Sequence, residues 1–216
     1  MIVSISRELG AGGLTVGEAV AKALGAELLD ERKVIGILAS RLGLSENYVA
    51  GTVERPRKFA EELLIDIAYA SAMLVGQQVF RPNDEELIAA ARAVVTETAE
   101  RGHVVVIGHG GPALLQRFER ADKLTILLHA SPAFRVAQVA QRLGLDEEEA
   151  RRRVERVDRA RALYLQRHFD LHLYEARNYD LVLNTEFLGL ENAAAMACAS
   201  ATAAVARRGA QPNSST

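Results

Sequence analysis

Residues 1–24 read MIVSISRELGAGGLTVGEAVAKAL, and this stretch decides the fold. Residues 2–6 are apolar apart from two serines, as expected of a short buried strand. Three glycines follow within residues 7–13, and residues 14–24 carry apolar side chains at helical spacing. A strand that runs through a glycine loop into a helix points unpaired helix N–H groups at one spot, which suits a phosphate. The predicted phosphate-binding residues are Arg7, Gly10, Ala11, Gly12, Gly13, Leu14 and Thr15.

Three interpretations of this glycine loop are open from the residues alone. A P-loop, G-x-x-x-x-G-K-[ST], places its second glycine at Gly12, but Gly13 then stands where the lysine is expected. A dinucleotide-binding loop, G-x-G-x-x-G, fits Gly10 and Gly12, and Asp30 lies where its ribose-binding acid is expected. That loop turns almost directly off its strand, whereas residues 7–9 separate this strand from Gly10. A glycine turn with a structural role alone is the third interpretation.

Composition and charge limit the classes of partner. Of 216 residues, 49% are hydrophobic and 25% charged, which is ordinary for a globular protein. The net charge of −2 gives no overall field that would attract nucleic acid or an acidic membrane, so we expect neither partner. The single cysteine, Cys198, excludes an intramolecular disulfide. With no signal peptide and no membrane-spanning run in the sequence, we expect a cytoplasmic protein.

Strand and helix patterns alternate along the rest of the chain, which predicts an α/β fold with a mostly parallel sheet. Further strands are expected at residues 26–30, 104–107, 123–129 and 179–184. Helices are expected at residues 31–42, 57–79, 84–101, 112–120 and 132–143, from residue 146 onward, and at 190–207. Ligands bind beyond the carboxyl ends of such strands, where residues 7–13, 30, 108–111 and 184–185 should meet.

Four stretches of this chain resemble the cytidylate kinase-like family, a branch of the P-loop nucleoside monophosphate kinases. ISRELGAGG at 5–13 is similar to the family's S-R-E-x-G-S-G-G opening, which also lacks the P-loop lysine. LLD at 28–30 is similar to the end of the strand that follows the family's first helix. ERVDRAR at 155–161 is similar to the E-R-x-D-R-x-R lid segment of cytidylate kinases. YDLVLNT at 179–185 resembles the closing Y-D-L-V-I-N-T strand.

The resemblance implies a P-loop NTPase fold, a three-layer sandwich around a five-stranded parallel sheet of order 2-3-1-4-5. It implies one domain over residues 1–208, with a helical acceptor-binding insertion at about 44–100 and an arginine-bearing lid at about 150–175. Residues 209–216 are expected to be a disordered tail. The sequence departs from the family pattern at Leu14 and His109, where basic residues are usual, and at residues 30–36, which do not read D-S-G-x-x-Y-R.

Phosphoryl transfer requires positive charge against the phosphate oxygens, and here the P-loop lysine is missing. Candidates to supply that charge are Arg7 and the lid arginines Arg156, Arg159 and Arg161, which we predict to be catalytic. Arg156 and Arg159 share a helical face, whereas Arg161 points elsewhere. The alternative is that the lid arginines form a solvated basic face paired with nearby acids.

Five further side chains are candidates for the site, each with a structural alternative. Thr15 has the best-placed hydroxyl for a Mg²⁺ shell, or is an ordinary first-turn residue. Asp30 binds the acceptor or a magnesium water, or caps a helix. His109 contacts phosphate or is structural, and Arg135 contacts the donor nucleotide or makes a surface ion pair. Asp158 orients an arginine or makes a helix ion pair.

From these residues and the resemblance we expect a nucleotide kinase that uses Mg²⁺ with ATP or another nucleoside triphosphate. It would transfer the γ-phosphate to a nucleoside monophosphate such as CMP, or to a similar small acceptor, as a monomer or a homodimer. One alternative is a regulatory nucleotide-binding module with a degenerate P-loop and little catalysis. The other is a dinucleotide enzyme that binds NAD.

Overall fold

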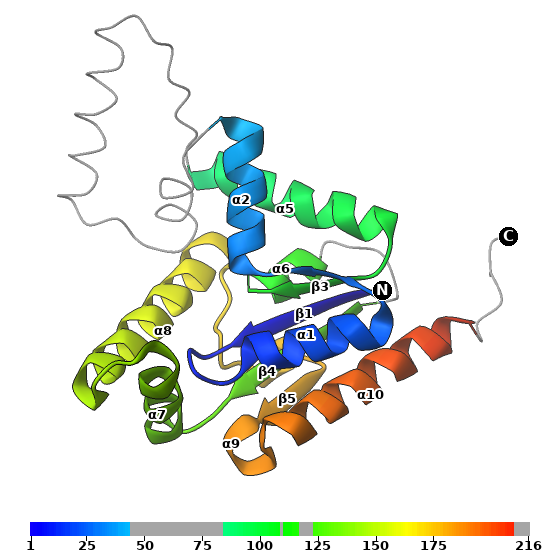
Figure 1. Ribbon diagram of the computed structural model, residues 1–216. Helices are drawn as coiled ribbons and strands as arrows, with labels where there is room; N and C mark the ends of the chain where they lie inside the picture. The colour runs from blue at the N-terminus through cyan, green and yellow to red at the C-terminus, as the bar shows by residue number, and fades with distance from the viewer. Residues whose placement is uncertain (44–83, 109, 117–122, 210–216) are drawn as a thin grey trace, which may run out of the picture.

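A computed structural model describes residues 1–43, 84–108, 110–116 and 123–209, and these form a five-stranded parallel sheet flanked by helices (Figure 1). The sheet order is β2-β3-β1-β4-β5, which confirms the predicted order 2-3-1-4-5. The strands are β1 (Ile2–Arg7), β2 (Glu27–Leu29), β3 (Val104–Ile107), β4 (Lys123–His129) and β5 (Leu181–Asn184). In the centre of the sheet, Ile2 of β1 is in register with Val104 of β3 and Lys123 of β4.

The helices follow the predicted order, and several begin and end at residues with clear capping geometry. Asp30, Ser131 and Asp146 each accept a backbone N–H at the start of a helix, while Gly25 and Gly144 end helices with positive φ. The helices are α1 (Gly13–Leu24), α2 (Glu31–Leu42), α5 (Asp84–Arg101), α6 (Gly111–Gln116), α7 (Pro132–Leu143), α8 (Glu147–Phe169), the short 3₁₀ helix η1 (Ala176–Asn178), α9 (Thr185–Leu188) and α10 (Leu190–Gly209).

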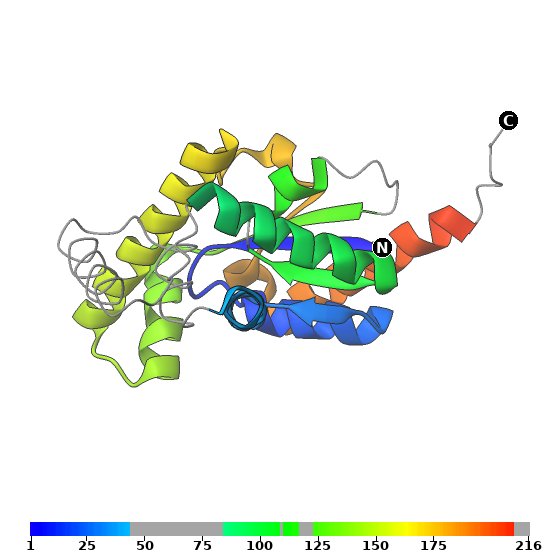
Figure 2. The same cartoon turned by 90° about the horizontal axis from the view of Figure 1, so that it is seen from above.

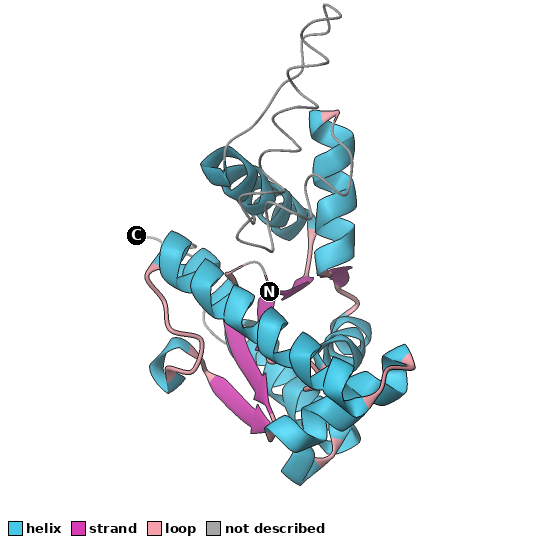
Figure 3. Cartoon of the chain, turned by 90° about the vertical axis from the view of Figure 1, so that its left-hand side faces the viewer, coloured by secondary structure: helices cyan, strands magenta, loops and turns pink. Residues whose placement is uncertain are grey.

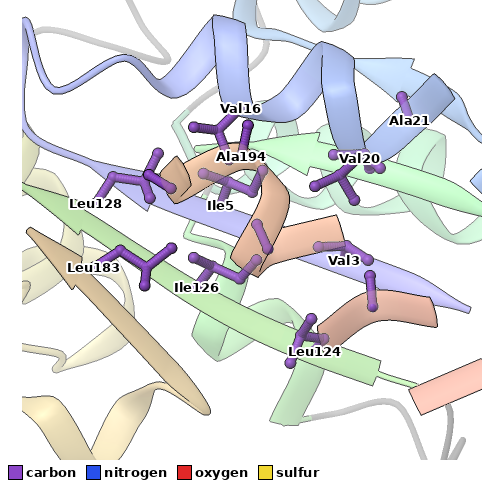
Figure 4. Packing of buried hydrophobic residues seen from close by; sticks show 14 of the residues in the cluster. Val3, Ile5, Val16, Val20, Ala21, Leu124, Ile126, Leu128, Leu183 and Ala194 are labelled. Atoms are coloured by element: carbon purple, nitrogen blue, oxygen red, sulfur yellow. The ribbon is translucent and has the colours of Figure 1, made fainter. Parts of the chain in front are cut away.

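Helices α1 and α10 cover one face of the sheet, where a large part of the core lies. Val3 and Ile5 of β1 and Ile126 and Leu128 of β4 point toward these helices (Figure 4). The small side chains of α10, such as Ala193 and Ala197, are fully buried and let this helix pack directly against α1. The alanine-rich sequence of α10 is therefore explained by a close helix–helix contact.

Helices α5 and α6 lie on the opposite face, and α2 packs against α5 (Figures 2 and 3). Val94, Val95 and Ala99 of α5 are buried with Val104 and Val106 of β3. This helix falls in the range predicted for the insertion but is part of the sheet-covering layer. The rest of that range, residues 44–83 with the predicted helix at 57–79, lies outside the described residues, as does most of the predicted tail.

The largest departures from the predicted elements are near the end of the chain. Strand β5 begins at Leu181 rather than at residue 179, because η1 precedes it and the Tyr179 N–H donates to the Ala176 carbonyl at the end of that helix. The short helix α9 is not predicted from the sequence. It begins at Asn184, whose side chain accepts the N–H groups of Glu186 and Phe187. None of the helices in the described ranges has the length and apolar character needed to cross a membrane.

Candidate phosphate-binding site

The glycine loop joins β1 to α1 at the carboxyl end of the sheet. Gly10 and Gly12 have φ values of +88° and +80°, which other residues rarely adopt. A Cβ on Gly10 would lie 2.6 Å from the carbonyl oxygen of Arg135, so the loop packs directly on the backbone of α7. Gly12 is the N-cap of α1 without a side-chain cap, and the first turn holds no acid. The N–H groups of that turn are thus available to an anion.

Arg7 lies between the glycine loop and the end of β3. A Cβ on Gly13 would lie 2.8 Å from Cγ of Arg7, and one on Gly108 would lie 2.3 Å from its Nη1. The two glycines therefore leave the space that this side chain occupies. Gly13, which replaces the P-loop lysine, allows a different cation to lie beside the start of α1.

A second arginine converges on the same place from α8. Arg7 donates from Nη2 to Oε2 of Glu31 at 2.8 Å, and Nη2 of Arg161 lies 3.7 Å from the same oxygen. The exposed fractions of the two arginine side chains are 13% and 21%. Burial, and then repulsion from Arg7, lowers the pKa of the Arg161 guanidinium to about 10, which leaves it charged at neutral pH. Two cations thus share one carboxylate.

A buried cluster of ion pairs connects the glycine loop to α7 and α8. Glu8, Arg135 and Asp158 come from the glycine loop, α7 and α8, and their side chains are at most 12% exposed. Arg135 pairs with Glu8 at 3.2 Å and with Asp158, and it donates from Nε to the carbonyl of Ala130 at 3.1 Å. Asp158 also accepts the Leu9 N–H at 2.9 Å. This cluster fixes the backbone of the loop through side chains of two helices.

The C-terminal end of α8 packs over the loop that follows β3. A Cβ on Gly110 would lie 2.4 Å from the ring of Phe169, so only a glycine accommodates this ring. The guanidinium of Arg92 on α5 lies 4.9 Å from the centroid of the same ring. Helix α8 therefore spans the carboxyl edge of the sheet, from the glycine loop to β3 and α5 (Figure 1).

The predicted lid arginines separate into two groups. Arg161 points toward Arg7 and Glu31, whereas Arg156 and Arg159 are exposed and form no ion pair in the described part of the chain. Arg151 and Arg152, earlier in α8, pair with Glu147 and Glu148, as the alternative of a solvated basic face expects.

The remaining predicted residues are placed as follows. Thr15 and Leu14 are exposed on the first turn of α1. Asp30 caps α2 by accepting the Lys33 N–H at 2.8 Å, the alternative considered for it. Arg135 is buried, which corrects the alternative of a surface ion pair, because Glu8 and Asp158 are both buried with it. Asp158 pairs with Arg135 of α7 rather than with an arginine of its own helix, and His109 lies outside the described residues.

Sequence reasoning missed Glu8 and Glu31, and it did not assign which face of α8 points toward the glycine loop. A signal for that face was present. Val154 and Leu165 are buried, and Asp158 and Arg161 follow Val154 by four and seven residues, which places all four on one side of the helix. Glu31 could be noticed only as an acid in the first turn of α2.

A family model described as the cytidylate kinase-like family matches residues 2–186 of this sequence. The chain belongs to the cytidylate kinase-like family. Its sheet order is that of a P-loop kinase fold. Family and fold indicate phosphoryl transfer of the nucleotide or nucleoside kinase type, and the family generally uses ATP with Mg²⁺.

Solved structures support the fold at low sequence identity. An uncharacterized protein from Eubacterium ventriosum has a TM-score of 0.66 and 15% identity, covering 94% of this chain and 98% of that one. A Thermus thermophilus protein has a TM-score of 0.50 and 19% identity, covering 93% and 97%. None of the curated proteins matches this sequence significantly.

Proposed function

We propose that this protein transfers the γ-phosphate of ATP, or of another nucleoside triphosphate, to a nucleoside monophosphate such as CMP or to a similar small acceptor. The observation that carries the proposal is the convergence of Arg7 and Arg161 beside an uncapped helix N-terminus. The helix supplies N–H groups for the phosphates, and the arginines supply the formal charge that a lysine supplies in other P-loops.

The two arginines have different parts in the proposed reaction. Arg7 is fixed between Gly13 and Gly108, so its charge is in place before a substrate binds. Arg161 is on α8 and points toward Arg7, and we propose that it contacts the transferring phosphoryl group. For Arg156 and Arg159, which are exposed on another side of the same helix, we propose contacts with the acceptor. Positive charge at the equatorial oxygens is the largest contribution that a protein makes to phosphoryl transfer.

The site also fits a magnesium ion bound with the nucleotide. In P-loop NTPases a Ser or Thr hydroxyl and an Asp hold Mg²⁺ together with the substrate phosphates, and Thr15 places an exposed hydroxyl on the first turn of α1. When bound, the ion would neutralise charge on the β- and γ-phosphates. We propose Asp30 as an acceptor contact and His109 as a phosphate contact, and an indirect role for Arg135 and Asp158 in holding the loop.

A second candidate function is a regulatory module that binds nucleotide and turns it over slowly. Gly13 in the lysine position favours it, and so does Glu31, which already neutralises part of the charge on Arg7. This candidate predicts nucleotide binding without transfer to any acceptor.

The deciding experiment incubates the protein with γ-labelled ATP, Mg²⁺ and each nucleoside monophosphate in turn. We expect one labelled nucleoside diphosphate, and a loss of about 10³-fold in rate in Arg161→Met. Arg153→Met, an exposed arginine of the same helix, is the control and should retain the wild-type rate. ATP binding without any labelled product would support the regulatory module, and absence of both would refute the proposal.

A further inference from the structure

Glu31 holds an unusual position between two buried arginines. It is the first residue of α2, and its side chain is 32% exposed, more than either arginine that it contacts. Both guanidinium groups approach the same oxygen, at 2.8 and 3.7 Å. The carboxylate of Glu31, on the solvent side, thus contacts two guanidinium groups that lie deeper in the protein.

The cluster is incomplete in hydrogen bonding, although Asp30 and Asp158 also act on its arginines. Nη1 of Arg161 is buried and has no hydrogen-bond partner among the described residues. A buried guanidinium N–H without a partner is costly, and repulsion between Arg7 and Arg161 adds to that cost. An anion with more acceptor atoms than one carboxylate, placed between the two arginines, would supply the missing hydrogen bond and reduce the repulsion.

We propose that the Glu31 carboxylate is a resting counter-ion, which a substrate phosphate displaces from between Arg7 and Arg161. This inference rests on the proposed function, because it concerns the same phosphate site. A phosphate dianion brings two charges and three acceptor oxygens, enough to satisfy both guanidinium groups. Glu31 starts a helix at the surface, so its carboxylate can turn into water when the phosphate enters.

The displacement gives the site a preference for dianions. A ligand has to compete with a carboxylate that is attached to the same chain and therefore present at high effective concentration. A monoanion such as acetate offers the arginines nothing that Glu31 does not already provide. A phosphate ester offers an additional charge, so the expected ligands are terminal phosphates.

The test is Glu31→Gln, titrated calorimetrically with inorganic phosphate. If Glu31 occupies the site about 90% of the time, removing its charge should tighten phosphate binding about tenfold. The melting temperature without phosphate should fall, because the two arginines lose their counter-ion. These opposite changes distinguish displacement from a structural role, which would lower both affinity and stability.

Glu27→Gln is the matched control. Glu27 forms ion pairs with Lys33 and Arg101, away from Arg7 and Arg161, and its substitution removes one negative charge, as Glu31→Gln does. Its phosphate affinity should equal that of the wild type. Unchanged or weaker phosphate binding in Glu31→Gln would overturn the inference, while ATP binding by the wild type would leave the proposed function standing. If no variant binds phosphate or ATP, both fail. Should Glu31→Gln not fold, Glu31→Asp has a shorter reach and is expected to show the same tightening.

Discussion

The backbone N–H of Leu9 donates a 2.9 Å hydrogen bond to Oδ1 of Asp158, which ties the glycine loop to α8. The other carboxylate oxygen accepts from Arg135, whose Nη1 also lies 3.4 Å from the Leu9 carbonyl oxygen. Both polar groups of one loop residue are thus held by side chains from two helices. The conformation of the loop is set before any ligand binds.

Replacing Asp158 by alanine should lower the free energy of unfolding by about 3 kcal/mol, because Leu9 and Arg135 both lose a buried charged partner. Urea denaturation measures the change. Glu155→Ala, at an exposed position of the same helix, should stay within about 0.5 kcal/mol of the wild type. Equal effects of the two substitutions would show that the loop does not depend on α8.

Arg135→Met should be more destabilising than the loss of Asp158. It leaves two buried carboxylates, Glu8 and Asp158, without their shared cation, and such a loss costs about 3–5 kcal/mol. Arg142→Met, on the exposed end of α7, is the control. A melting temperature for Arg135→Met near that of the control would contradict the description of this cluster.

Two glycine substitutions separate backbone strain from steric overlap. In Gly25→Ala the positive φ of 58° meets no atom within 4 Å, so the cost should be about 1 kcal/mol. In Gly10→Ala the φ is 88° and the new Cβ lies 2.6 Å from a backbone oxygen, so we expect about 3 kcal/mol and a displaced loop. Gly10→Ala should also lose ATP binding, which Gly25→Ala retains. Similar stability for both variants would exclude the close packing of the loop on α7.

We expect the free energy of unfolding to fall at alkaline pH because of Tyr174. Partial burial, and then the carboxylates of Glu8 and Asp158, raise the pKa of this phenol to about 12. Its folded pKa is above the ordinary value of about 10, so the folded state keeps a proton that the unfolded state loses. The stability from this group is present below pH 10 and is lost as the pH rises toward 12.

Tyr174→Phe removes that titration and should reduce the fall in unfolding free energy as the pH rises above 10. Denaturation curves of the two proteins at about pH 9, 10 and 11 provide the comparison. Parallel declines would show that Tyr174 has no raised pKa in the folded protein.

The positions of the strands and of the glycine loop followed from local patterns in the sequence, whereas the sheet order 2-3-1-4-5 came from the family resemblance. Continuous β-branched runs such as residues 104–107 identify buried strands, and Ser131 and Asp146 mark helix starts within one turn. Glu8 could not be assigned in this way. Its partners, Arg135 and the Ala130 N–H, lie more than a hundred residues along the chain, and no local period links them.

The assignment of the arginines depended on how α8 is rotated against the sheet. Its many charged residues hide the narrow apolar stripe that includes Val154 and Leu165, so the basic positions alone do not show which face is inward. The packing of that stripe turns Arg161 toward Arg7 and leaves Arg156 and Arg159 exposed.

The most direct measurement is a calorimetric titration of ATP with Mg²⁺ into the wild type and into Arg161→Met, with NAD as the comparison ligand. We predict that the wild type binds ATP in preference to NAD, and that the variant binds ATP at least about tenfold more weakly, because a buried phosphate contact is lost. Equal ATP affinity in both proteins, or binding of NAD alone, would contradict a phosphate site built from the glycine loop and its two arginines.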